Sequence, residues 1–107
     1  MIPRFRPSRA AAALLLLTAL APGCFGPPQM GPDGEAFKTI DALYTAVSLR
    51  EPVHVDRCSG RLSKLREAGK LPASAHDALA AIIAEAKGGL WEQAQSRLRD
   101  FMLGQRR

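Results

Sequence analysis

The sequence has little of what catalysis, nucleic-acid binding or a spanning membrane helix requires. Only 6% of its 107 residues are aromatic and two are cysteines. The longest mainly apolar stretch covers residues 10–21, with Thr18 as its one polar residue, whereas a spanning helix needs about 20 apolar residues. No stretch shows the alternation of apolar and polar residues that is typical of a half-buried strand. These absences argue against an enzyme, a protein membrane anchor and a β-sheet.

The basic excess is also smaller than the whole chain suggests. The formal net charge is +5, but Arg4, Arg6 and Arg9 precede the apolar run. Without these three arginines, twelve basic residues face ten acidic ones and the net charge is +2. Nucleic-acid binding requires a concentrated basic footprint. We therefore expect no nucleic-acid partner.

The N-terminal region has the order of an export signal, in which arginines are followed by the apolar run and then by small residues. Cleavage by a general signal peptidase after Ala21 suits the residue sizes, but Pro22 follows, and proline fits poorly into an extended protease-bound strand. This alternative would leave Cys24 as a free thiol.

Residues 20–24, Leu-Ala-Pro-Gly-Cys, resemble the lipobox of bacterial lipoproteins. Gly23 and Cys24 match that pattern, and Pro22 departs from it. The resemblance implies that Cys24 carries lipid and becomes the mature N-terminus. It also implies that the protein is anchored to a membrane of the bacterial cell envelope and faces the periplasm or the cell exterior.

The lipidation prediction decides the expected state of the other cysteine. If the Cys24 sulfur carries lipid, Cys58 has no disulfide partner. Cys58 lies in an apolar stripe between Val55 and Leu62, where a free cysteine packs as a small hydrophobe. We therefore expect Cys58 in the core, with a redox-active thiol or an intermolecular disulfide as the alternatives.

The chain divides into four parts: a signal peptide (1–23), a lipidated N-terminus with a flexible tether (24–34), a helical domain (35–104) and a basic tail (105–107). Residues 25–34 hold three prolines and three glycines, so neither helix nor strand can propagate there. Fully stretched, such a tether spans about 33 Å.

Within the domain, apolar residues recur at helical spacing over 35–50, 52–68, 72–87 and 90–103. Asp33 can cap the first helix and Pro52 suits the first turn of the second. The third can open at Pro72 or with a capping box of Ser74 and Asp77. Short connections predict an all-α, antiparallel four-helix bundle. Its predicted core is Phe37, Ile40, Tyr44, Val47, Cys58, Leu62, Leu65, Leu79, Ile83, Trp91, Leu98 and Phe101.

From Arg61 onward the spacing resembles the helical domain shared by the steroid receptor RNA activator protein and the outer-coat scaffold of COPII vesicles. The matching positions are Leu62, Leu65, the turn 69–72, Leu79, Ile83, Gly89, Trp91, Ala94 and Leu98. The resemblance implies a helical interaction module without catalysis. Residues 89–94 also look like the start of a tetratricopeptide unit, but no second copy follows at a period of 34, and a solenoid needs about three repeats.

Two histidines are candidate metal ligands. His54 near Asp56 and His76 beside Asp77 lie at helix starts, and could offer imidazoles and carboxylates to a divalent metal if those ends met. Polar residues at helix starts are equally explained by capping and the helix dipole. The serines at 59 and 63 have no activating context. We expect no catalytic residue, metal or cofactor, and keep a metal-dependent function through His54 and His76 as the second alternative.

Arg57, Arg61 and Lys64 follow i, i+4, i+7 spacing and form a basic stripe. One interpretation is an interaction face for an acidic partner or anionic lipid headgroups. The other is a solvated face whose charge Asp56 and Glu67 offset. Trp91 could be an exposed anchor, but its phase with Leu98 favours the core.

Together these patterns predict a non-catalytic accessory or adaptor lipoprotein that binds another envelope protein, with no small-molecule substrate. The first alternative is a structural or lipid-surface-binding protein that uses the basic stripe.

Overall fold

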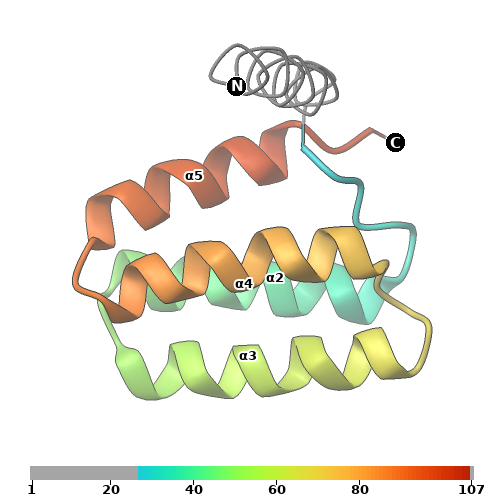
Figure 1. The fold of residues 1–107 in the computed structure, drawn as a ribbon, viewed down its shortest axis with the longest axis horizontal. Coiled ribbons are helices and arrows are strands. Elements are labelled where there is room, and N and C mark those ends of the chain that lie inside the picture. The colour runs from blue at the N-terminus through green and yellow to red at the C-terminus, as the bar shows by residue number, and fades with distance from the viewer. Residues whose placement is uncertain (1–26, 107) are drawn as a thin grey trace, which may run out of the picture.

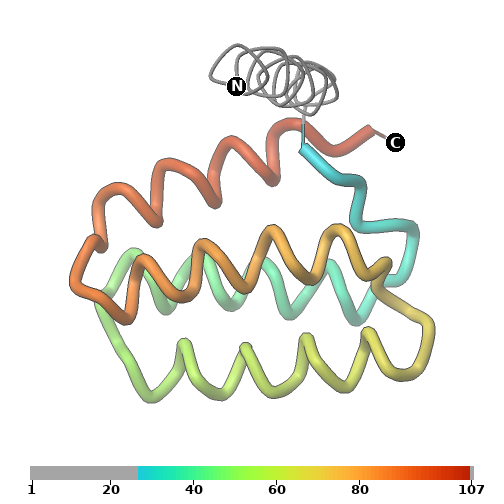
Figure 2. Tube along the Cα trace, viewed as in Figure 1, coloured from blue at the N-terminus to red at the C-terminus, as the bar shows by residue number. Residues whose placement is uncertain are grey.

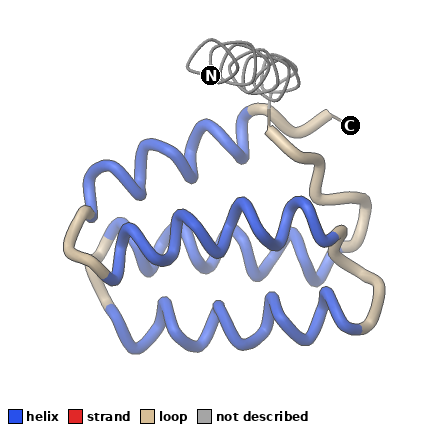
Figure 3. The backbone as a smooth tube through the Cα atoms, viewed as in Figure 1, coloured by secondary structure: helices blue, strands red, loops and turns tan. Residues whose placement is uncertain are grey.

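The computed structural model describes residues 27–106, so the predicted export signal and Cys24 lie outside the described residues. Four helices follow one another: α2 (Gly34–Ser48), α3 (Pro52–Glu67), α4 (Ala73–Lys87) and α5 (Trp91–Leu103). They run alternately in opposite directions (Figure 1), and the described residues contain no strand (Figure 3). The all-α, antiparallel bundle is confirmed.

The four helices form a closed ring in which α2 and α4 each pack against both α3 and α5. α3 and α5 are therefore diagonal neighbours. The chain trace (Figure 2) places the start of α2, the α3–α4 turn and the end of α5 at one end of the bundle. We call this the strap end, and we call the end that holds the α2–α3 and α4–α5 turns the far end.

Local chemistry explains most helix boundaries. The Asp33 carboxylate accepts a hydrogen bond from the Ala36 amide at 3.0 Å, and Pro52 occupies the first turn of α3, as predicted. Gly69 follows α3 with a φ of +76°, a conformation that glycine adopts at little cost. The capping box is wrong: α4 begins after Pro72 without a side-chain cap.

The core contains most of the predicted residues, but three predictions need correction. The Phe37 side chain is 53% exposed, and Tyr44 and Trp91 are only partly buried against the core. Met30 is buried instead, at 7% exposure. Helical periodicity places Phe37 on the apolar stripe of α2. It does not show that α5, which packs beside α2, ends at Leu103 and so leaves Phe37 uncovered.

Residues 27–33, which we call the strap, have neither helix nor strand, as expected. They are not a free tether, however. The Gln105 amide donates to the Pro28 carbonyl at 3.0 Å and its oxygen accepts from the Met30 amide at 2.7 Å. The Gln29 amide donates to the Gly104 carbonyl at 3.1 Å. Proline and glycine exclude regular structure from the strap. They do not prevent it from docking on the bundle through the buried Met30 side chain and the side-chain amides of Gln29 and Gln105.

Candidate interaction surfaces

The basic stripe is exposed along α3. Arg57, Arg61 and Lys64 take part in none of the ion pairs found among the described residues. Asp56 does not offset them, because its carboxylate pairs with the Lys87 ammonium of α4 at 2.7 Å. The stripe therefore presents net positive charge to solvent.

Arg57 and Arg61 also line a shallow cavity of about 410 Å³ between α2 and α3, together with His54 and Cys58. Cys58 is free and buried, which confirms the predicted core position. Burial raises the pKa of its thiol, while the positive charges of Arg61 and Arg57 act in the opposite direction. A buried thiol with a raised pKa is a weak nucleophile at neutral pH.

Three large apolar side chains are exposed at the far end. Leu49, Val53 and Leu90 are 63%, 66% and 51% exposed; we call them the far-end rim. Sequence patterning did not identify this surface, although all three residues lie within two positions of a helix end. Their position next to a turn was the feature of the sequence that could have indicated their exposure.

Arg50 lies in the α2–α3 turn with a φ of +56°. It lines a cavity of about 350 Å³ with Leu90 and Trp91. A left-handed conformation costs a residue with a Cβ roughly 1–2 kcal/mol, and glycine is the usual residue after a helix. Backbone strain of this kind concentrates at functional positions.

The two histidines lie at opposite ends of the bundle. His54 is near the start of α3, 3.8 Å from the Glu51 carboxylate, whereas His76 is near the start of α4 at the strap end. The 16 residues of α3 separate these ends by about 24 Å. Within residues 27–106, no three metal-ligating side chains cluster. The ends that a shared metal site requires do not meet.

His76 has a partner that sequence reasoning missed. Ser63 Oγ lies 3.4 Å from His76 Nε2, and His76 Nδ1 lies 3.3 Å from Asp77 Oδ1. This order matches a serine-hydrolase triad, but both distances are long. Ser63 lies inside α3, where backbone amides are used in helix hydrogen bonds and cannot form an oxyanion hole. The three side chains line none of the cavities described here.

No family model, curated protein or solved structure matches the chain. The resemblances to the lipobox and to the helical interaction domain therefore stay predictions that depend on the residues quoted for them. Among residues 27–106, no helix has the length and apolar character needed to cross a membrane.

Proposed function

We propose that this chain is an exported lipoprotein that is anchored to a membrane of the bacterial cell envelope through Cys24. Its bundle binds another envelope protein as a non-catalytic accessory subunit. The support for the anchor is the order of arginines, apolar run and Gly23-Cys24. The support for the partner comes from the two ends of the bundle.

The strap shortens the connection between lipid and domain. Two residues, Phe25 and Gly26, lie between Cys24 and Pro27, so the three Cα–Cα steps span at most about 11 Å. Pro27 lies beside Gly104, after the end of α5. A lipid on Cys24 would therefore hold the strap end close to the membrane and leave the far end about 20 to 24 Å further out, one helix length away.

The exposed far-end rim is the observation that carries the proposal. Exposed apolar side chains with polar residues at their edge are typical of protein interaction sites, and arginine is enriched in interaction hot spots. Arg50 lines a cavity with Leu90 of the rim. The basic stripe of α3 continues this charge along the side of the bundle. The partner surface that fits is apolar at its centre and acidic at its edge.

The stripe fits a protein better than the headgroups of the anchoring membrane. It lies on α3, the diagonal neighbour of α5, and α5 is the helix beside which Pro27 lies. The residues that would bind headgroups therefore lie across the bundle from the lipid. No observation favours the metal-dependent alternative.

The test is capture of the tagged lipoprotein from membranes after mild crosslinking, with identification of a partner present in stoichiometric amount. Reversal of Arg57, Arg61 and Lys64 to Glu should abolish capture without changing helicity, because exposed charges contribute little to stability. The matched control reverses Arg66, Lys70 and Arg99, three exposed basic residues that are not part of the stripe. Equal capture by both triple variants would remove the stripe from the interface.

The anchor is tested separately on Cys24→Ala. The wild type should carry fatty acid on residue 24, by mass spectrometry of the mature N-terminus, and should sediment with membranes. The variant should do neither. A mature N-terminus that begins before Cys24 would overturn the anchor.

A further inference from the structure

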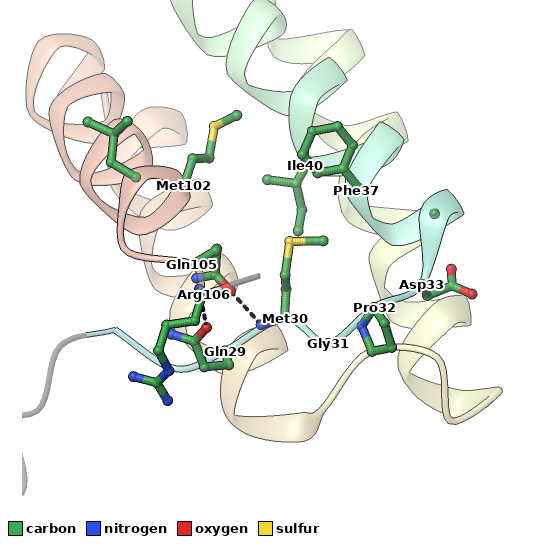
Figure 4. A pocket seen from close by; sticks show the side chains of 12 residues that line it. Gln29, Met30, Gly31, Pro32, Asp33, Phe37, Ile40, Met102, Gln105 and Arg106 are labelled. Carbon is green, nitrogen blue, oxygen red and sulfur yellow. Dashed lines mark hydrogen bonds between the residues drawn. The ribbon is translucent and has the colours of Figure 1, made fainter.

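A groove of about 830 Å³ opens at the strap end. It lies between the strap, the start of α2 and the end of α5, as Figure 4 shows. Met30 and Ile40 are buried at its floor, while Phe37 and Leu103 at its edge are 53% and 77% exposed. Met102 lines it from α5. The floor of the groove and the two exposed side chains at its edge are thus apolar.

Charged residues of both signs lie at or near this apolar surface. Arg106 lines the groove, and Lys38 is exposed next to Phe37 in α2. The acidic group that lines the groove, Asp33, accepts a hydrogen bond from the Ala36 amide and is committed to capping α2. Glu35 is exposed nearby. Arg106 therefore lies at the groove itself, and Lys38 is an exposed cation one position after Phe37 in α2.

The length of chain before the strap identifies what covers the groove. Pro27 begins the strap and is at most about 11 Å along the chain from Cys24. A lipid on Cys24 thus brings the bilayer surface to this end of the domain. Protein segments that rest on a bilayer place apolar side chains at the boundary of headgroups and acyl chains, and basic side chains beside anionic headgroups.

We propose that the groove rests on the phospholipid bilayer that holds the Cys24 lipid. Phe37 and Leu103 insert at the headgroup boundary, and Lys38 and Arg106 lie among the phosphates. This inference rests on the proposed lipidation of Cys24. It adds an orientation: the bundle stands on its strap end and presents the far-end rim away from the membrane.

The experiment uses the full lipidated protein in vesicles of phosphatidylethanolamine and phosphatidylglycerol with brominated acyl chains, which quench tryptophan fluorescence. The background variant Trp91→Phe removes the one native tryptophan. Phe37→Trp and, separately, Leu103→Trp then place a reporter at the groove. Leu90→Trp is the matched control, since Leu90 at the far end is exposed to nearly the same extent as Phe37, 51% against 53%.

Tryptophan at positions 37 and 103 should shift its emission to the blue and lose most of its intensity to bromine, whereas tryptophan at position 90 should do neither. Equal quenching at all three positions, or none at position 37, would overturn the orientation. A blue shift without quenching at position 37 would also overturn it, because the Cys24 acyl chain, which carries no bromine, would then fill the groove.

Lipid mass spectrometry on the same sample separates this inference from the proposed function. If Cys24 carries lipid and position 37 is not quenched, the anchor stands and the groove does not face the bilayer. If Cys24 carries none, the anchor fails, and quenching on added vesicles still decides whether the groove binds a bilayer by itself. Circular dichroism melting within a few degrees of the wild type shows that each variant is folded.

Discussion

The two ends of the bundle expose apolar side chains for different reasons. At the far end, two short turns connect the helices directly, and Leu49, Val53 and Leu90 remain outside the core. At the strap end, a segment without regular structure folds back, and Met30 fills a core position under Phe37. The far-end rim is exposed because its residues lie at turns outside the apolar stripes. Phe37 lies on an apolar stripe and is exposed because α5 ends at Leu103.

The two ends of the bundle contribute differently to stability. Side chains at the strap end hold the fold together through contacts between residues more than seventy positions apart in the sequence. Side chains of the far-end rim are at least half exposed to solvent. Changes at the strap end should therefore alter stability, and changes at the far-end rim should alter binding.

The largest effect is expected midway between the ends. Leu62 is 1% exposed in α3, so Leu62→Ala should lower the free energy of unfolding by about 2 to 5 kcal/mol. Chemical denaturation measures this change, and hydrogen exchange should show both ends losing protection together. A loss below about 0.5 kcal/mol, the usual size for surface substitutions, would show that the α3 stripe is not in the core.

Met30→Ala should cost about 2 kcal/mol, at the lower limit of core methionine truncations. The cost is limited because the strap can leave the bundle rather than keep a cavity. Hydrogen exchange should rise in the strap and at the start of α2 and stay unchanged at the far end. Unchanged stability would restore the free tether that composition alone predicts.

Gly104→Ala tests whether Pro27 is seated on the bundle. A Cβ at position 104 would lie 2.5 Å from Pro27 Cγ and 2.8 Å from Pro27 Cδ. The backbone itself accepts alanine, because its φ is −83°. The ring must therefore move, at a cost of about 1 kcal/mol, measured by thermal unfolding and by NMR shifts of residues 27–30.

Gly60→Ala is the matched control for this substitution. Gly60 lies inside α3, and a Cβ there would meet nothing within 4 Å. The variant should therefore be more stable than the wild type by about 0.5 to 1 kcal/mol. Equal effects of the two glycine substitutions would argue against the docked position of Pro27.

Two glutamines also differ in what their side chains bond. Gln105 at the strap end bonds the Met30 amide and the carbonyls of Pro28 and Phe101, so Gln105→Ala should cost about 1 kcal/mol through partly buried backbone groups left unpaired. Gln93 in α5 bonds the Glu85 carboxylate at an exposed site. Gln93→Ala should change the unfolding midpoint in urea by less than the measurement error, and a reversed order would contradict the contrast.

The smallest stability effect is expected at the far-end rim. Leu90→Ser should change the free energy of unfolding by less than about 0.5 kcal/mol, because the side chain is already half in solvent. The same variant should weaken capture of the envelope partner, measured by quantitative crosslinking beside the wild type. Undiminished capture would move the partner surface away from the far end.

Sequence patterning predicted the helices well because their signals are local. Apolar spacing marks a helix wherever it lies, and Asp33, Pro52 and Gly69 act on backbone groups within a few residues. The stripe of Arg57, Arg61 and Lys64 was likewise predictable, since positions on one helix fix which residues share a face. The sequence did not predict that Asp56 leaves the stripe unpaired, because the Lys87 ammonium with which Asp56 pairs lies on α4.

By itself, the sequence determined the all-α class, the four helices and their alternating directions, because periodicity, caps and short connections are properties of neighbouring residues. Only the tertiary structure decided that the strap is docked, that Phe37 is exposed and that His54 and His76 lie at opposite ends. Each of these depends on where another helix ends or which distant group completes a hydrogen bond. Composition can exclude a helix from the strap, but the long-range contacts of Met30 and Gln105 decide whether the strap is docked on the bundle or extends into solvent.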